Sequence, residues 1–451
     1  MVRAMANTLT EIDADGFVQP SLAESWEASS DAKTWSFELR KGVEFQNGKS
    51  FTAKDVVASI NYHRGEKSES SVKPIVKPIK EIRTDGDYVV VFELEGGNAD
   101  FPFILDTHGL VIFPAAADGS LDWRPGIGTG GYILEHYEPG VDAKLKRNPN
   151  YWKENRAHVD EVLLLTIKDS AARSNALITG GVDAIDQVDL KTAHLLARQS
   201  GFKVEETSGP LHYTFPMHTQ TAPYNDNNVR LALKHAIDRE EMLKKVLKGH
   251  GTIGNDHPIG PSYRYHAADI DQNVYDPDKA RHFLKKSGLD SLTVKLSAAD
   301  AAFEGAVDAA VLFSESAGKA DIKIEVIREP DDGYWSNVWL KKPFCACYWA
   351  GYSTEDVMLS TGYASGAPWN DTQWNNPKFE ELVAIARSEL DESKRRELYR
   401  DIQIMLRDEG GAIVPIFANN VSARSEHIDH GKLSSTASFD GRRIVERWWM
   451  V

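Results

Sequence analysis

The sequence predicts an α/β protein built of two or more lobes, on three observations. Its 451 residues exceed the size at which a single compact core normally stops growing. Residues 292–296, 306–313 and 322–327 follow a strand, helix, strand pattern, which implies a parallel strand pair with a right-handed crossover. No internal repeat, low-complexity tract or long linker divides the sequence. We therefore expect lobes joined by several crossings of the chain.

In the first part of the chain, segments with the period of a strand alternate with segments with the period of a helix. Trp35 and Leu39 lie on the same side of an expected strand, because apolar and polar residues alternate between them. Thr52 and Asp55 have the spacing of a capping box, which predicts that a helix begins there. Two further strands are expected at residues 88–94 and 162–167.

Three aspartates mark helix starts in the middle of the chain. Asp226, Asp238 and Asp276 each precede an apolar segment of helical period, so each is expected to cap a helix. Farther on, two apolar stripes predict helices with one buried face. The stripes consist of Phe379, Leu382, Val383, Ala386 and Leu390, and of Leu398, Ile402, Met405 and Leu406.

The composition restricts the partners of the chain. Asp and Glu number 67 against 52 Lys and Arg, a formal net charge of -15 that repels phosphate backbones, so nucleic acid is not expected. No apolar run approaches the roughly 20 residues that cross a bilayer, which predicts a soluble chain. The cysteines, Cys345 and Cys347, would share one face of a strand and lack further zinc ligands, so we interpret them as small core residues.

Motifs for catalysis, cofactors and metals are missing from the sequence. The cluster Gly126, Gly128, Gly130 and Gly131 lacks the following Lys-Ser/Thr of a phosphate-binding loop. The 14 histidines are scattered, without a carboxylate spaced to complete a ligand set. We therefore expect no enzyme, no cofactor and no metal site, although an unrecognised pair of carboxylates stays an alternative.

Aromatic residues are dense between Trp335 and Trp374. For Trp335 and Trp339 we favour the core. Aromatics beside glycine and polar residues suit a wall that stacks on a solute, while polar neighbours orient it and ring faces attract cations. We interpret six residues as candidates for such a ligand-binding wall, and burial in the core is the alternative. They are Tyr348, Trp349, Tyr352, Trp369, Asn370 and Asp371.

The order of segments closely resembles the peptide/nickel/opine class of solute-binding proteins of bacterial ABC importers. The resemblance covers nearly the whole chain and is strongest in six segments. They are LAESWEASSDAKTWSFELRKGVEFQNGKSFTAKDV (22–56), GTGGYILEHYEPGVDAKLKRNPNYW (128–152), GGVDAID (180–186), APYNDNNVRLALKHAIDREEM (222–242), YDPDKARHFLKKSG (275–288) and AIVPIFANN (412–420).

The resemblance implies a periplasmic protein that captures a small polar solute, such as a peptide, opine, sugar, chelate or cationic compound. It implies two α/β lobes that close like a clamp, an accessory domain, delivery to an inner-membrane ABC permease, and a monomer. A two-lobed α/β enzyme such as a hydrolase and a ligand-sensing domain are the alternatives. The implied domains are a first lobe of residues 1–9, 128–236 and 426–451, an accessory domain of residues 10–127, and a second lobe of residues 237–425.

Two departures from the family pattern bear on this expectation. The first ten residues show no export signal, and the family's first strand is missing, so we expect that the start of the chain has been lost. Peptide binders of the family place an aspartate three residues after a tryptophan that resembles Trp349, where this chain has Tyr352. By position, His218 and Thr219 resemble ligand-contacting residues of the first lobe, and His108 resembles a contact of the accessory domain.

Overall fold

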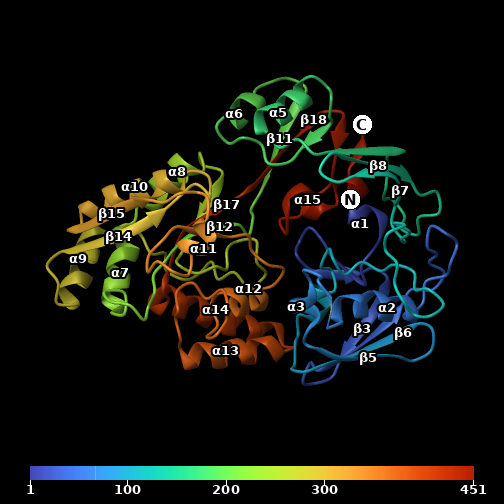
Figure 1. Cartoon of the computed structure of the whole chain (residues 1–451), viewed down its shortest axis with the longest axis horizontal. Helices are drawn as coiled ribbons and strands as arrows, with labels where there is room; N and C mark the ends of the chain where they lie inside the picture. Colours follow the sequence, from blue (N-terminus) through green and yellow to red (C-terminus); the bar gives the residue numbers. More distant parts are fainter. Residues whose placement is uncertain (67) are drawn as a thin grey trace. The chain divides into compact units, whose positions relative to one another are not determined.

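The computed structural model describes residues 1–66 and 68–451, in which the chain forms two compact units (Figure 1). Unit 1 consists of Met1–Glu205, Arg387–Leu390 and Val421–Val451, and unit 2 of Glu206–Ala386 and Asp391–Asn420. The chain thus passes between the units more than once. The expected boundaries after residues 127, 236 and 425 describe three domains rather than two units, and they stay a prediction.

The N-terminal half of unit 1 folds around a four-stranded antiparallel sheet. Its order is β3 (Ala23–Ala28), β4 (Thr34–Leu39), β6 (Val89–Leu94) and β5 (Ile79–Thr84). Along β4, Trp35, Phe37 and Leu39 are buried and alternate with more exposed residues, as their period predicts. Helix α2 (Ala53–Arg64) contacts β5 and β6, and the predicted capping box of Thr52 and Asp55 is present at its start.

A second sheet of unit 1 packs against the start of the chain. It runs β7 (Tyr132–Glu138), β8 (Asp142–Arg147), β9 (Glu161–Leu165), and α1 (Val2–Met5) contacts β7. A Cβ atom at Gly128 would lie 2.2 Å from the carbonyl oxygen of Met5, and one at Gly130 would lie 2.4 Å from that of Ala4. These glycines therefore permit the close approach of the two segments.

The remaining elements of unit 1 are short. They are β1 (Thr10–Ile12), β2 (Val18–Pro20), α3 (Lys73–Val76), α4 (Phe101–Ile104), α5 (Ser170–Ile178), β10 (Ala184–Ile185), α6 (Ala193–Leu196), β19 (Ile428–Asp429), α15 (Ser438–Arg442), α16 (Ile444–Arg447) and β20 (Trp449–Met450). The chain leaves unit 1 within β11 (Phe202–Thr207) and returns within β18 (Asn420–Ser425). These two strands are neighbours in one sheet, ordered β10-β18-β11.

Buried ion pairs join distant segments of unit 1. The guanidinium of Arg443 lies 2.7 Å from Asp106 and 3.3 Å from both Glu11 and Glu446. Burial alone would raise the pKa of Glu11, but the cations around it, Arg443 first, hold that pKa well below its usual range. We call this set the Arg443 network; its members are Arg3, Glu11, Asp106, Lys153, Asp440, Arg443, Glu446 and Arg447.

The core sheet of unit 2 is antiparallel and ordered β13 (Gly251–Ile253), β17 (Ala412–Ala418), β12 (His212–Pro216), β16 (Cys347–Trp349). A separate pair, β14 (Leu292–Ala298) and β15 (Ile322–Arg328), is parallel and is connected by α10 (Ala306–Gly318). The predicted strand, helix, strand unit is thereby confirmed. Cys345 and Cys347 are buried and free, consistent with their interpretation as core residues.

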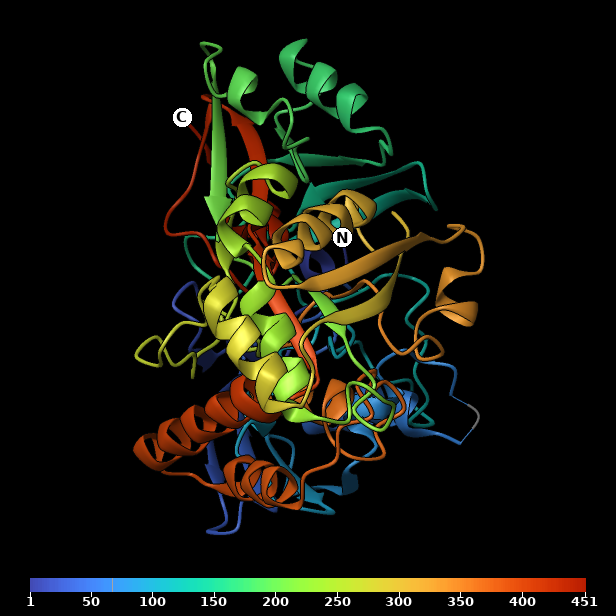
Figure 2. The same ribbon diagram turned by 90° about the vertical axis from the view of Figure 1, so that its left-hand side faces the viewer.

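Aspartate side chains cap three helices of unit 2, as predicted. Asp226, Asp238 and Asp276 accept hydrogen bonds from backbone N–H groups of α7 (Asn227–Ala236), α8 (Arg239–Val246) and α9 (Pro277–Lys286), respectively. The two apolar stripes belong to α13 (Pro377–Ser388) and α14 (Glu392–Glu409), which lie side by side in both views (Figures 1 and 2). Leu390 is the exception, because α13 ends two residues before it and its side chain is exposed. The other helices of unit 2 are α11 (Tyr334–Asn337) and α12 (Glu355–Gly362).

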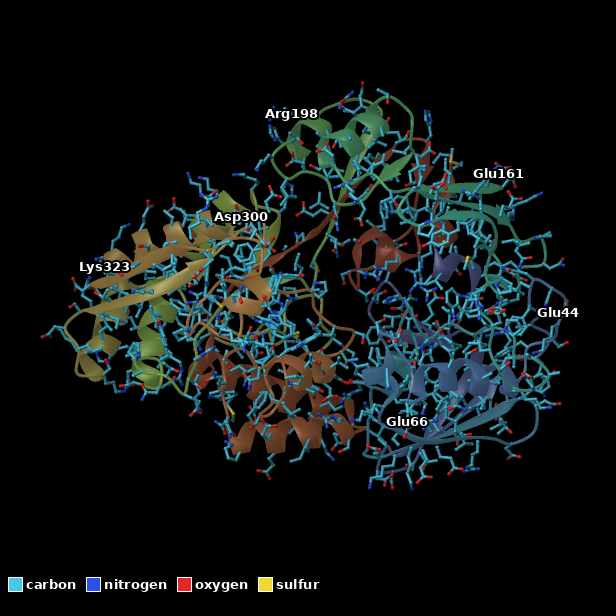
Figure 3. All side chains as sticks on the ribbon, in the orientation of Figure 1. Glu44, Glu66, Glu161, Arg198, Asp300 and Lys323 are labelled. Atoms are coloured by element: carbon cyan, nitrogen blue, oxygen red, sulfur yellow. The ribbon has the colours of Figure 1, made fainter. Side chains whose placement is uncertain are left out.

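Charged side chains are distributed over the surface of each unit (Figure 3). The labelled residues are all exposed; they are Glu44, Glu66, Glu161 and Arg198 in unit 1, and Asp300 and Lys323 in unit 2. Among the described residues, no helix is sufficiently long and apolar to span a membrane.

Candidate functional site

The edge of the core sheet of unit 2 carries a group of aromatic side chains. Strand β16 is the edge strand, where Trp349 pairs with His212 and Tyr348 with Tyr213 of β12. Side chains alternate along β16, so Cys347 and Trp349 are buried while Tyr348 is 40% exposed. This alternation directs one aromatic ring outward and the next one inward.

Five aromatic rings are in contact at this edge, and we call them the aromatic wall: Trp335, Trp339, Tyr348, Trp349 and Trp369. The ring of Trp335 lies 5.6 Å from that of Tyr348 and 5.7 Å from that of Trp339, in edge-to-face geometry. The rings of Trp339, Trp349 and Trp369 are separated from one another by 6.3–6.4 Å. These distances are typical of favourable aromatic pairs.

The aromatic wall has an exposed outer layer. Trp335, Tyr348 and Trp369 are 40%, 40% and 47% exposed, whereas Trp349 is buried and packs in the core of unit 2. Tyr348 contacts Trp335, and Trp335 and Trp369 both contact Trp339. Large aromatic side chains are normally buried or mostly covered, so three exposed rings connected in this way form an unusual surface. Such a surface can stack on the flat or apolar part of a ligand.

A buried carboxylate lies beneath the rings. Asp371 is 4% exposed, and its Oδ2 accepts a hydrogen bond from Trp339 Nε1 at 3.1 Å. Burial raises the pKa of this carboxyl group to about 7, against the opposing effect of hydrogen bonds from Trp339, Trp349 and Cys347. Asp371 is therefore poised to change its charge near neutral pH.

The loop that carries Asp371 is held by its own polar groups. The side-chain amide of Asn370 donates to the carbonyl oxygens of Trp374, at 2.8 Å, and Ala364, at 3.2 Å, while its oxygen accepts from the hydroxyl of Thr372. The backbone N–H of Thr219 donates to the carbonyl oxygen of Thr372. Asn370 and Thr219 thus orient the loop through these bonds, and their contact with a solute stays a prediction.

The other expected residues lie outside the aromatic wall as defined above. His218 is buried after β12, next to Thr219, and burial lowers the pKa of its imidazole. Tyr352 packs against the core of unit 2, where its backbone N–H donates to the hydroxyl of Tyr263. His108 belongs to unit 1, where desolvation and the charges of Arg442 and Arg3 lower its pKa. The structure therefore brings Trp349, Tyr348, Trp369, Asp371, Asn370 and Thr219 together.

Trp335 differs from its expected place in the core. It is 40% exposed, so that interpretation is wrong for Trp335, while Trp339 is partly buried against the core. The reason is local: Gly333 adopts a left-handed conformation at the start of α11, a single short turn that leaves Trp335 on the surface. The spacing of four residues between Trp335 and Trp339 was the available signal that the two rings would meet.

Known structures share this fold. A structure of HbpA2 from Haemophilus parasuis superposes with a TM-score of 0.86 at 20% identity, covering 98% of this chain and 94% of that one. NikZ from Campylobacter jejuni, in complex with Ni(L-His), superposes with a TM-score of 0.81 at 20% identity, covering 99% and 94%. Both likenesses identify the two-lobed α/β fold of periplasmic binding proteins, which confirms the predicted fold class.

The sequence comparisons define the family. The family described as "Bacterial extracellular solute-binding proteins, family 5 Middle" matches residues 18–371. The dipeptide-binding protein of Escherichia coli is 25% identical over 439 residues, which cover 88% of this chain and 80% of that protein. The chain belongs to family 5 of the bacterial extracellular solute-binding proteins, and it is a solute-binding component of an ABC importer.

Proposed function

We propose that this protein captures a small solute on the aromatic wall of unit 2 and passes it, chemically unchanged, to an ABC permease in the inner membrane. The observation that carries the proposal is the exposed layer of Trp335, Tyr348 and Trp369 in contact with the buried rings above Asp371. Family membership supports a periplasmic location and a permease partner.

The family does not determine the solute. One similar protein is named for dipeptides and another was solved with a nickel–histidine complex. This chain has Tyr352 at the position where the peptide binders of the family carry an aspartate, so recognition of a peptide α-amino group at that position is not supported. The solute class must therefore be inferred from the side chains of this chain.

The proposal is tested by identifying a solute and then removing rings of the wall. Native mass spectrometry of freshly purified protein detects a retained solute, and a thermal-shift screen of peptides, opines, sugars, metal chelates and cationic compounds detects added ones. A solute at a hundredfold excess over its Kd stabilises the folded protein by about 2.7 kcal/mol. Trp369→Ala should weaken binding about tenfold, because it removes one stacking partner.

Trp123→Ala is the matched control, because Trp123 is 48% exposed in unit 1 and lies outside the wall. It should leave the Kd of the solute unchanged. Equal affinity of the wild type, Trp369→Ala and Trp335→Ala would contradict the proposed site. A solute that is released in a chemically altered form would contradict the transport function and would support the hydrolase alternative.

A further inference from the structure

We propose that the solute of this protein is positively charged and that Asp371 is its counter-ion, an inference that rests on the proposed function and specifies its substrate class. Asp371 lies in the loop beside the aromatic wall and is 4% exposed. No ion pair joins it to a lysine, arginine or histidine in the described part of the chain. Its hydrogen-bond donors, Trp339, Trp349 and Cys347, are all neutral.

A buried carboxylate without a cation is unfavourable, because desolvation of the charge is not offset by an opposite charge. Two other buried carboxylate sites in the described part of the chain offset this cost with a cation. In the same unit, both oxygens of Asp256 contact the guanidinium of Arg239, at 2.7 and 2.8 Å. In unit 1, Arg443 lies between Glu11, Asp106 and Glu446. Asp371 has no such cationic partner in the described part of the chain, and a cationic solute would provide one.

The remaining titratable groups near Asp371 do not supply that charge. Burial raises the pKa of the thiols of Cys345 and Cys347 and of the phenol of Tyr363, so these groups are neutral at pH 7. His218 lies one residue before Thr219, which bonds to Thr372, and burial lowers the pKa of its imidazole. The described groups that act on the pKa of Asp371 are thus hydrogen-bond dipoles, and none of them carries a positive charge near neutral pH.

The aromatic wall suits the same class of solute. The face of an indole or phenol ring is electronegative, and a cation above it gains about 0.5–2 kcal/mol, depending on how far it is desolvated. Three such rings are exposed in the aromatic wall, whose inner member Trp339 donates a hydrogen bond to Asp371. The formal net charge of -15 attracts cations toward the protein. An ammonium or guanidinium group would contact ring faces and the field of one carboxylate together.

The test compares charged and neutral probes of the same shape. Choline and agmatine serve as cations, 3,3-dimethylbutan-1-ol as the neutral analogue of choline, and succinate and glucose as anionic and neutral references. Binding is measured by thermal shift and by titration calorimetry at pH 6, 7 and 8. We expect at least one cation to bind, with an affinity at least tenfold above that of the neutral and anionic probes, and we expect this affinity to increase with pH as Asp371 ionises.

Asp371→Asn distinguishes the contribution of the carboxylate charge to binding from the contribution of the aromatic wall. The amide preserves the size of the side chain and its hydrogen bond with Trp339, but it removes the charge. Cation affinity should fall at least tenfold and should lose its pH dependence. Calorimetry in buffers of different ionisation enthalpy should detect proton release on cation binding to the wild type near pH 7 but not to the variant. Asp332→Asn, an exposed acid near Trp335, removes an equal charge and should change neither result.

Three outcomes overturn the inference. If no cation binds, or if Asp371→Asn binds the cation as tightly as the wild type and with the same proton release, Asp371 is not a counter-ion. If a neutral or anionic solute binds the wild type and loses affinity in Trp369→Ala, the proposed function holds while the charge of the solute is wrong. Unchanged binding of every solute in Trp369→Ala would instead contradict the proposed site itself.

Discussion

Two buried carboxylate sites, one in each unit, have opposite pKa shifts. In the Arg443 network of unit 1, Glu11 and Glu446 are surrounded by arginine and lysine side chains, and their pKa values are lowered despite burial. In unit 2, Asp371 is surrounded by indoles and thiols, and burial raises its pKa to about 7. The comparison teaches that burial alone does not decide whether a carboxylate is charged, since the nearest groups decide it.

The difference in pairing indicates that the two sites have different roles. A fully paired network joins segments that are distant in the sequence and contributes to stability only while every partner is present. An unpaired carboxylate at a surface of exposed rings costs stability and is retained for another reason, such as binding. Variants that remove the charges of either site should therefore change stability in opposite directions.

The largest effect is expected from Arg443→Met. This change leaves Glu11, Asp106 and Glu446 buried without their shared cation, so the free energy of unfolding should decrease by about 3–5 kcal/mol. Urea unfolding at pH 7, followed by tryptophan fluorescence and circular dichroism, measures the change. Arg198→Met, which removes an exposed arginine of unit 1, is the control and should leave the unfolding midpoint unchanged. Equal effects of both variants would mean that the network contributes nothing specific.

Asp371→Asn should act in the opposite direction in the solute-free protein. An unfolded aspartate ionises near pH 4, whereas the folded Asp371 does so at about 7. Between these values the folded state binds more protons, so this group lowers stability as the pH increases, by about 1.4 kcal/mol per pH unit. Relative to the wild type, the variant should therefore gain stability from pH 4 to 7 and keep that gain at pH 8. A stability difference that is constant across these pH values would contradict the raised pKa.

Two buried histidines of unit 2 affect the stability of the protein at acid pH. Burial lowers the pKa of His257 to about 3 and that of His212 to about 4, whereas an unfolded histidine is protonated near pH 6.5. Below pH 6.5 the unfolded state binds more protons, so stability is lost as the pH falls, by about 1.4 kcal/mol per pH unit for each histidine.

His257→Phe preserves a ring of similar size and removes one of these two titrations. Between pH 6.5 and 4.5, the free energy of unfolding of this variant should decrease less than that of the wild type. The difference should equal the contribution of one histidine, about 1.4 kcal/mol per pH unit. Urea midpoints at pH 6.5, 5.5 and 4.5 measure the slope. His194→Phe, which replaces an exposed histidine of α6, serves as the control for the substitution itself.

Local features of the fold were predictable because their causes are local. The capping box at Thr52 and Asp55 and the cap at Asp238 depend on side chains a few residues apart, and both are present. The parallel pair of β14 and β15 follows from a pattern within one short segment of the chain. Such features need no knowledge of distant partners.

The geometry of the candidate site was predictable only in part. The density of aromatic residues indicated a wall, but the contacts that define it join Trp339, Trp349 and Asp371 from three separate segments. The exposure of Trp335 depends on how one short helical turn begins, and the Arg443 network joins residues from both ends of unit 1. Tertiary packing decides these features, and hydrophobic periodicity carries no information about them.

The ends of unit 2 have a consequence for protein engineering. Strands β12 and β17, close to where the chain enters and leaves this unit, are paired neighbours, with His212 opposite Phe417. A segment whose two ends lie side by side can be excised, closed with a short peptide, or exchanged with its counterpart from a relative without stretching the flanking chain. Residues 206–420, which hold all of unit 2 together with Arg387–Leu390 of unit 1, therefore form a segment that can be exchanged as a whole, so that its contribution to solute affinity can be measured.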